Sequence, residues 1–446
     1  MFTRVLVANR GEIAVRVIRA LHELGIEAVA VYSTADEGAL HVRLADHAVR
    51  VGPPPAAESY LRIPSIVAAA ATTGCQAVHP GYGFLAENPA FVEACVDNDL
   101  VFVGPPARVM TTMGDKIAAR QAMRAADVPT VPGTDGATTV TAARAAADEL
   151  GYPVLLKAAA GGGGKGMRIV EAPDELEDAF GAAAAEAAAA FGDPTLYVEK
   201  VLTPARHVEI QVLCDEHGNV LTLGERECSI QRRHQKLIEE TPSPALTVEL
   251  REQMEAAAER ACRAVGYVNA GTFEFLLGPD GTFSFIELNA RLQVEHPVTE
   301  LTTGIDLVRG QLQVAAGEPL TVSGRAPRRG HSIEIRLNAE DPDRDFMPAP
   351  GLMTRFRPAQ GPGVRIDTFV EDGTVITPHY DSLLGKLVVW DVDRPAAIAR
   401  ALRALEETVI EGVPSTRELA IEVLRSHAFA RGEYSTSTLA GLMVVA

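Results

Sequence analysis

The chain has 446 residues, 47% hydrophobic and 22% charged, which is typical of a globular protein with room for roughly three domains. Its formal net charge of −18 argues against general binding to nucleic acid or to an anionic membrane surface, because such binding needs a basic face. Small molecules and proteins are the expected partners. A site for an anionic nucleotide must therefore gather its own lysines, arginines and backbone amides.

The five cysteines are odd in number, widely spaced and free of any Cys/His ligand spacing, so neither a disulfide framework nor a zinc site is expected. We therefore expect a reducing compartment. No apolar run is long enough for a membrane span, and the N-terminus does not resemble a signal peptide. These features predict a cytoplasmic location.

Residues 1–113 alternate short apolar runs with helical patterns. This alternation predicts an α/β domain with a parallel sheet covered by helices. Strands are expected at 5–7, 28–31, 77–78 and 101–103, and helices near 13–24, 63–73 and 88–97.

From residue 114 to about 323 the pattern favours an α+β arrangement instead. A linker with one proline and three arginines is expected at 324–330, followed by a domain of strands and one helix over 331–446. No tandem repeat is visible. The expected elements of the central part are strands 154–157 and 195–199, a hairpin over 271–289, and alanine-rich helices over 142–147 and 182–190.

A glycine-rich segment, residues 157–167, stands between two apolar strands. Its glycines allow backbone amides to wrap a polyphosphate, and its two lysines supply positive charge. The match to a G-x-G-x-x-G dinucleotide loop is weak because no helix follows, and Gly166 after Lys165 excludes a Walker A loop. A flexible surface loop is the alternative; we favour a mobile lid over phosphates.

The hairpin over 271–289 carries candidate metal ligands. With a four-residue loop, Glu274 would lie opposite Phe285 and diagonal to Glu287, and Asn289 would share their face. Oxygen ligands in this arrangement suit magnesium that bridges ATP phosphates. A bulge or a different loop length would break the register, and carboxylates on an exposed strand face are the alternative.

The segment after the hairpin places Arg291, Gln293 and Glu295 on one side if it is extended. A guanidinium in a fixed position can hold bicarbonate or a carboxylated intermediate, and a nearby carboxylate can remove the bicarbonate proton. A surface patch of salt bridges is the alternative.

Residues 225–236 gather cationic and titratable side chains in an acidic protein, and we interpret them as a nucleotide and anion wall. A charged run on a solvated helix is the alternative. Cys228 lacks the neighbours of a nucleophile, which favours a structural thiol.

Together these segments resemble the biotin carboxylase family over essentially the whole chain. The motifs that carry the resemblance are Ala8–Ala14, His79–Leu85 with Glu87 and Asn88, Met113–Lys116, Arg232–Lys236, Phe285–Asn289, Gln293–Pro297 and Arg336–Pro342. The resemblance implies an N-terminal Rossmann-like (pre-ATP-grasp) domain over 1–113 and an ATP-grasp domain over 114–323. It also implies a mobile glycine-rich lid over about 131–203 and a C-terminal mixed α+β domain over 331–446.

The resemblance also implies the roles of individual residues. Lys116 and Lys157 would hold ATP phosphates, Glu199 and Lys200 would lie at the adenine, and further nucleotide-binding residues would be Gly163, Gly164, Leu202, His207, Gln231 and His234. Glu274 and Glu287, with Asn289 nearby, would bind two magnesium (or manganese) ions. Bicarbonate would lie among Lys236, Arg291, Gln293 and Val294, with Glu295 as the base and Arg336 steadying the biotin enolate.

The implied activity is ATP-dependent carboxylation of biotin by bicarbonate through carboxyphosphate, the first half-reaction of an acyl-CoA carboxylase, with acetyl-CoA carboxylase favoured. The expected partners are a biotin carboxyl carrier protein or domain, a second copy of the chain in a homodimer, and a carboxyltransferase subunit. Residues 400–446 contain no biotin attachment motif, so biotin must come from a partner or from a longer form of the protein. Ala159 and Ala160 and the turn at 278–281 depart from some family members without touching a proposed ligand.

Three other functions are weighed against this one. A different ATP-grasp ligase, forming a carbamoyl or acyl phosphate, would share the lysines, the glycine loop and the metal hairpin, but Arg336 and the 291–295 segment argue against it. A silent nucleotide-binding subunit would be expected to have lost Glu295, Lys236 or a metal carboxylate. A dehydrogenase lacks its acidic residue in a βαβ context.

Overall fold

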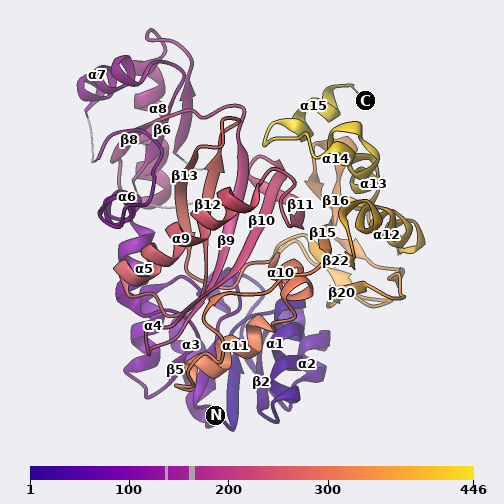
Figure 1. Ribbon diagram of the computed structural model, residues 1–446. Helices are drawn as coiled ribbons and strands as arrows, with labels where there is room; N and C mark the ends of the chain where they lie inside the picture. The colour runs from indigo at the N-terminus through magenta and orange to yellow at the C-terminus, as the bar shows by residue number, and fades with distance from the viewer. Residues whose placement is uncertain (136–138, 160–165, 446) are drawn as a thin grey trace.

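The computed structural model describes residues 1–135, 139–159 and 166–445. The first part of the chain forms a five-stranded sheet of order β3-β2-β1-β4-β5, parallel throughout, as expected (Figure 1). Helix α1 begins shortly after β1 and buries Ile13, Val17 and Leu21. The elements are β1 Arg4–Val7, α1 Gly11–Glu23, β2 Glu27–Ser33, α2 Leu40–Leu44, β3 His47–Gly52, α3 Ile63–Thr72, β4 Ala77–His79, α4 Pro89–Val96 and β5 Val101–Phe102.

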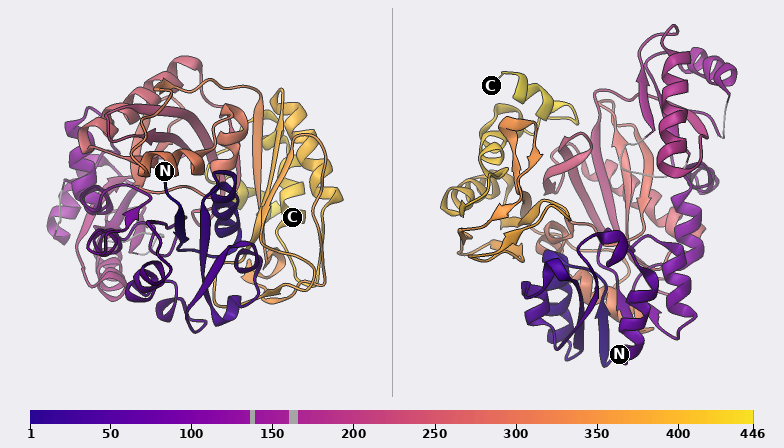
Figure 2. Two further views of the ribbon diagram at one scale, coloured as in Figure 1. Left: turned by 90° about the horizontal axis from the view of Figure 1, so that it is seen from below. Right: turned by 180° about the vertical axis from the view of Figure 1, so that it is seen from behind.

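Helices α5 (Ala107–Gly114) and α6 (Lys116–Ala125) lead to a small subdomain that projects from the body, on the side away from the C-terminal helices in Figure 2. It consists of a three-stranded antiparallel sheet of order β7-β6-β8 and two helices that match the alanine-rich segments. Alanine suits this packing, because the alanines that face the sheet, Ala143, Ala147, Ala183 and Ala187, are fully buried. The elements are α7 Val140–Leu150, β6 Val154–Ala158, β7 Met167–Val170, α8 Leu176–Phe191 and β8 Leu196–Lys200.

The largest sheet has nine strands in the order β13-β12-β9-β10-β11-β15-β22-β20, with β14 paired to β10. It continues from the central part of the chain into the C-terminal part through the β11–β15 pair. Residues 225–236 lie in β10, the following turn and β11, so the alternative of a solvated helix is wrong. The strands are β9 Arg206–Cys214, β10 Val220–Arg232, β11 Gln235–Thr241, β12 Asn269–Leu277, β13 Phe283–Asn289, β14 Gly324–Arg325, β15 His331–Asn338, β20 Val364–Thr368 and β22 Leu383–Asp391, with helices α9 Val248–Val265, α10 His296–Thr303 and α11 Leu307–Ala315.

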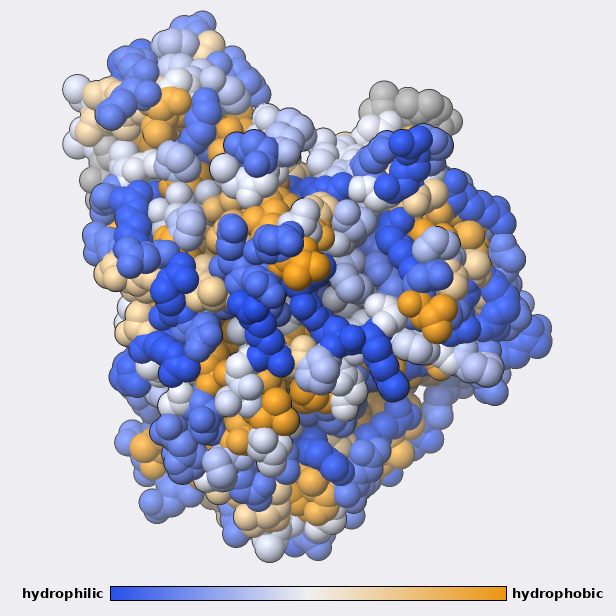
Figure 3. All heavy atoms as spheres, in the orientation of Figure 1, coloured by the Kyte–Doolittle hydropathy of each residue, from blue (hydrophilic) through white to orange (hydrophobic). Residues whose placement is uncertain are grey.

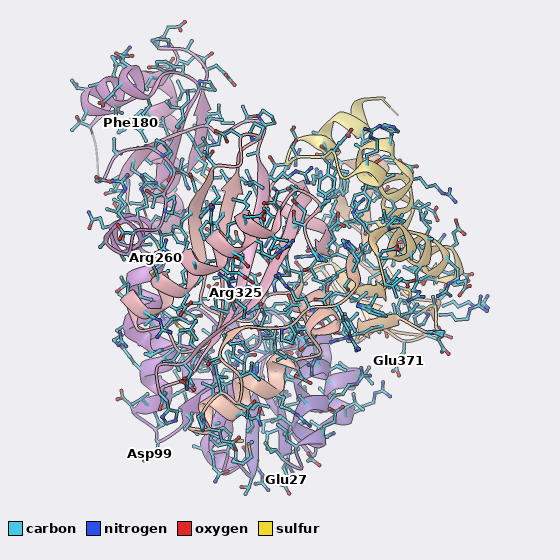
Figure 4. All side chains as sticks on the ribbon, viewed as in Figure 1. Glu27, Asp99, Phe180, Arg260, Arg325 and Glu371 are labelled. Carbon is cyan, nitrogen blue, oxygen red and sulfur yellow. The ribbon has the colours of Figure 1, made fainter. Side chains whose placement is uncertain are left out.

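The expected linker over 324–330 is partly ordered into the sheet. Gly324 and Arg325 form β14 beside β10, and Arg325 (labelled in Figure 4) reaches Glu252 and Glu255 of α9 at 3.1 and 3.3 Å. The stretch therefore lies fixed against the central sheet.

The expectation of one helix after residue 331 is wrong, because four helices follow in the part that the structure describes. Helix α12 packs Ala397, Ala401 and Leu405 against the sheet, whereas two of the others span only five and eight residues and carry a weaker periodic signal. These helices are α12 Arg394–Glu407, α13 Arg417–Arg425, α14 His427–Arg431 and α15 Thr438–Val445, and short strands are β16 Glu340–Asp341, β17 Met347–Pro348, β18 Gly351–Leu352, β19 Arg355–Arg357, β21 Val375–Ile376 and β23 Val409–Glu411. Among the residues described, no helix combines the length and the apolar character needed to cross a membrane.

Candidate active site

A cavity of about 1170 Å³ is lined by side chains from the N-terminal sheet, the projecting subdomain, the large sheet and the C-terminal part. Figure 3 shows this side of the molecule hollowed between the projecting subdomain and the C-terminal helices. Gly163 and Gly164 lie outside the described residues. Of the other predicted site residues, all line the cavity except Glu295, and these are Lys116, Lys157, Glu199, Lys200, Leu202, His207, Gln231, His234, Lys236, Glu274, Glu287, Asn289, Arg291, Gln293, Val294 and Arg336.

Glu295 is fully buried and lies directly behind two cations of the cavity wall. Its Oε1 accepts a hydrogen bond from Lys236 Nζ at 2.6 Å, and its Oε2 accepts one from Arg336 Nη2 at 2.9 Å. Burial would raise the pKa of Glu295, but Lys236 and then Arg336 outweigh it and hold the pKa well below the usual range. The carboxylate is therefore ionised and both of its oxygens are engaged.

Lys236 is bound by three carboxylates. Its Nζ donates to Glu209 at 2.6 Å, to Glu274 at 2.9 Å and to Glu295 at 2.6 Å. Burial would lower the pKa of Lys236, but Glu209, followed by Glu274 and Glu295, raises it well above the usual value. The lysine is thus a fixed positive charge at the point where the β10–β11 hairpin meets Glu295.

The sequence interpretation missed Glu209, which lies behind Lys236. Glu209 lies in β9 and is fully buried, and its other oxygen accepts a hydrogen bond from the buried Arg226 Nε at 2.5 Å. The alternation of His207, Glu209 and Gln211 with apolar residues in one strand was the available signal, because it places three polar side chains on one buried face.

The hairpin formed by β12 and β13, which carries the candidate metal ligands, has a different register from the expected one. Leu277 pairs with Phe283, so the loop is one residue longer, and Glu274 pairs directly with Glu287 rather than with Phe285. Ile286 is the extra residue of a β-bulge between these pairs. The longer loop alone would have placed the two carboxylates on opposite faces, and the bulge returns them to one face.

Glu274, Glu287 and Asn289 offer the oxygen donors that Mg²⁺ or Mn²⁺ prefers, so they fit such an ion. Asn289 Nδ2 donates to Glu274 Oε1 at 2.9 Å, and His207 Nε2 lies 3.0 Å from Glu274 Oε2. Loss of solvation in the cavity, and then the charge of Glu274, raises the pKa of Glu287. A divalent cation would relieve this repulsion.

Arg291 and Gln293 lie together, as expected, with Arg291 Nη1 donating to Gln293 Oε1 at 3.1 Å. Arg291 Nε also donates to Glu87 at 2.8 Å, which gives a role to a residue of the motif over 79–88. The expected alternation does not continue to Glu295, because its backbone turns (φ −81, ψ 11) where α10 begins. Glu295 is therefore held by the turn before α10 and by Lys236 and Arg336, rather than by an extended strand.

In another part of the cavity wall, Lys157 Nζ donates to Glu199 at 3.0 Å and Arg120 Nη1 donates to the same carboxylate at 2.6 Å. Burial, and then the nearby charge of Lys157, lowers the pKa of Lys116. Two lysines that repel each other suit a polyanion. The amine of Lys200 instead donates to the carbonyl oxygen of Gly151 at 2.7 Å, in the projecting subdomain.

Cys228 is fully buried, and burial raises the pKa of its thiol well above the usual value. A nucleophilic cysteine needs a lowered pKa and some exposure, so the structural interpretation of this thiol is confirmed.

Three family models match consecutive parts of the chain: "Biotin carboxylase, N-terminal domain" at residues 1–110, "Carbamoyl-phosphate synthase L chain, ATP binding domain" at 115–323, and "Biotin carboxylase C-terminal domain" at 334–441. A biotin carboxylase from Nostoc sp. is 52% identical over 438 residues, which cover 98% of each protein. The chain belongs to the biotin carboxylase family. A biotin carboxylase from Pseudomonas aeruginosa is 50% identical over 97% of this chain and 96% of that protein.

Solved biotin carboxylase structures agree with this assignment. The Campylobacter jejuni biotin carboxylase in a β,γ-ATP complex has a TM-score of 0.97 and 46% identity, covering 99% of both chains. The biotin carboxylase domain dimer of the Hydrogenobacter thermophilus 2-oxoglutarate carboxylase, described with MgADP, ADP and bicarbonate, has a TM-score of 0.95 and 46% identity over 99% of this chain and 98% of that one. These comparisons confirm the fold class and the family resemblance.

Proposed function

We propose that this chain carboxylates biotin on a carrier, using ATP and bicarbonate, and that carboxyphosphate is the intermediate. The observation that carries the proposal is the ionised Glu295, held between Lys236 at 2.6 Å and Arg336 at 2.9 Å directly behind the cavity wall. A fixed base beside two cations suits an anionic substrate that must lose a proton. The similar 2-oxoglutarate carboxylase domain is described with bicarbonate and MgADP.

The nucleotide would bind on the side of Lys116 and Lys157, where paired positive charges face the cavity. Mg²⁺ or Mn²⁺, held by Glu274 and Glu287 with Asn289 nearby, supplies charge neutralisation to the phosphates when bound. Glu199, Lys200, Leu202, His207, Gln231 and His234 would complete the nucleotide site, with Gly163 and Gly164 in the glycine-rich lid.

Bicarbonate would lie among Lys236, Arg291, Gln293 and Val294, where its charge meets two cations. Glu295 takes the bicarbonate proton, and the freed oxygen attacks the γ-phosphorus of ATP, which releases ADP. Carboxyphosphate then breaks into carbon dioxide and phosphate. The phosphate removes the biotin N–H proton, and Arg336 stabilises the enolate oxygen of the biotin anion that attacks carbon dioxide.

A depressed pKa makes Glu295 a weak base as long as both of its oxygens hold cations. An anionic substrate that binds Lys236 or Arg336 competes with Glu295 for those donors. Substrate binding therefore raises the basicity of Glu295 at the moment when the base is needed.

Biotin would come from a carrier protein or domain, and a carboxyltransferase would pass the carboxyl group to the final acceptor. Relatives of similar identity include a pyruvate carboxylase subunit of Methanothermobacter thermautotrophicus, 52% identical over 98% of this chain and 89% of that protein, so acetyl-CoA carboxylase is one proposed assembly among several. A homodimer, a cytoplasmic location and the division into domains at 1–113, 114–323 and 331–446, with a lid over about 131–203, stay predictions.

The test is bicarbonate-dependent ADP release by the purified chain, with and without free biotin. We expect biotin to stimulate release, and Glu295→Ala and Arg336→Ala to abolish the stimulation. Arg309→Ala is the control, because Arg309 is exposed and outside the cavity lining. A rate of ATP hydrolysis that depends on neither bicarbonate nor biotin would contradict the proposal and favour another ATP-grasp ligase.

A further inference from the structure

Lys386 joins three parts of the chain at one buried ammonium group. It lies in β22 of the C-terminal part and its side chain is 0% exposed. Its Nζ donates to the carbonyl oxygen of Val294 at 2.9 Å and lies 3.0 Å from Oε1 of Glu12, in the first turn of α1. The N-terminal helix, the C-terminal sheet and the loop before α10 therefore share one contact.

The carbonyl that Lys386 binds belongs to the Val294–Glu295 peptide. Because a peptide unit is planar, fixing this oxygen also fixes the nitrogen of Glu295 and limits the direction in which its side chain leaves the backbone. The loop over 290–295 lies outside the helices and strands of the fold, so its backbone depends on contacts of this kind.

Lys386 keeps its charge although it is buried. Burial would lower its pKa, but Glu12, followed by Glu334 and Asp367, raises it above the usual value. A hydrogen bond from an ammonium is stronger than one from a neutral donor, so the Val294 carbonyl is held firmly.

Glu12 extends the contact to the cavity. Its carboxylate also accepts a hydrogen bond from the hydroxyl of Tyr82, and Tyr82 lines the cavity wall. The motif over 8–14, which had no assigned role in the chemistry, and Tyr82 of the motif over 79–88 thus meet at the Glu12 carboxylate that holds the ammonium.

We propose that Lys386, held by Glu12, is a positioning residue that sets the direction of the Glu295 carboxylate toward bicarbonate. This inference rests on the proposed function, because it concerns the same base.

The central variant is Lys386→Met, which keeps the length of the side chain and removes the ammonium. We expect kcat of bicarbonate-dependent ADP release to fall about tenfold to a hundredfold, as for a small misplacement of a reacting group, while the KM for ATP stays unchanged. Glu12→Gln, which keeps the size and an acceptor oxygen, should reduce kcat less and in the same direction, and it carries the test if Lys386→Met does not fold.

The decisive readout uses a Glu295→Gln background. If Lys386 acts through Glu295, then Lys386→Met, or Glu12→Gln in its place, costs no further activity once the base is gone. Arg251→Met is the matched control for general damage, because Arg251 lies outside the cavity lining and its loss, which removes a partner of the buried Glu225, should lower stability without lowering kcat.

A folded Lys386→Met protein with unchanged kcat, or an equal loss in the Glu295→Gln background, would overturn the inference. Failure of the proposed function is seen separately, as wild-type ADP release that depends on neither bicarbonate nor biotin.

Discussion

Glu240 ties the C-terminal helices to the large sheet, and replacing it by glutamine should destabilise the protein measurably. Its buried carboxylate accepts hydrogen bonds from His331 Nε2 at 2.6 Å, from Arg394 at 2.7 and 2.9 Å, and from the hydroxyl of Tyr434. Burial would raise the pKa of Glu240, but the hydrogen bonds from His331 and Arg394 lower it from 4.5 to about 2. A shift of about 2.5 pKa units corresponds to about 3 kcal/mol of the free energy of unfolding at pH 7.

The sign follows from the direction of the shift. Because the folded-state pKa of Glu240 lies below the unfolded-state value, its contribution is complete above about pH 4.5 and is lost as the pH falls toward 2. At pH 3.5 about 2 kcal/mol should remain. Glu240→Gln should therefore lower the free energy of unfolding by about 3 kcal/mol at pH 7 and by less at pH 3.5.

Urea unfolding can measure this difference through the fluorescence of Trp390, the single tryptophan, which lies in β22 of the same sheet. The control is Glu371→Gln, because Glu371 is exposed and should leave the unfolding midpoint unchanged. Equal stability of Glu240→Gln and wild type at pH 7, or a difference that does not shrink on acidification, would refute the reasoning.

Three other outcomes are expected. Glu295→Gln should lower kcat for bicarbonate-dependent ADP release by on the order of a hundredfold and leave the KM for ATP unchanged in steady-state kinetics, and a near-normal kcat would contradict the role of base. Glu287→Gln removes the charge of one of the two carboxylates that face each other across the hairpin, so the Mg²⁺ concentration for half-maximal activity should rise about tenfold, whereas an unchanged requirement would contradict the ligand assignment. Cys228→Ala should leave kcat unchanged, and the native thiol should resist iodoacetamide until the protein unfolds; rapid labelling of the folded protein would show that it is accessible.

The β12–β13 hairpin shows how much of the candidate metal site could be predicted from the alternation of residues. Alternation placed Glu287 and Asn289 on one face, and this holds, but the register to Glu274 depended on a loop length and a bulge. The adjacent apolar pair Phe285 and Ile286, which interrupts the alternation, was the visible signal of the bulge. A bulge re-aims every side chain beyond it, so small errors in register decide which residues can share a metal.

The residues that the sequence interpretation missed could not be predicted for a different reason. Glu209 and Glu239 both lie in buried strands. Glu209 binds Lys236, 27 residues further along the chain, and Glu239 binds Arg336, 97 residues further along. No local period predicts contacts of that separation, since they depend on the order of strands in the sheet. The motif residues themselves were predictable because each carries its chemistry in a short stretch.

Lys236, Arg336 and Arg291 are already neutralised by the protein's own carboxylates. Lys236 binds three of them, Arg336 binds Glu239 and Glu295, and Arg291 binds Glu87. In a chain of net charge −18, this arrangement keeps these buried positive charges paired. An anionic substrate therefore exchanges with a carboxylate instead of meeting a bare cation. If Glu295 is the base, as proposed, its release from Lys236 or Arg336 would make the binding and the activation of bicarbonate the same event.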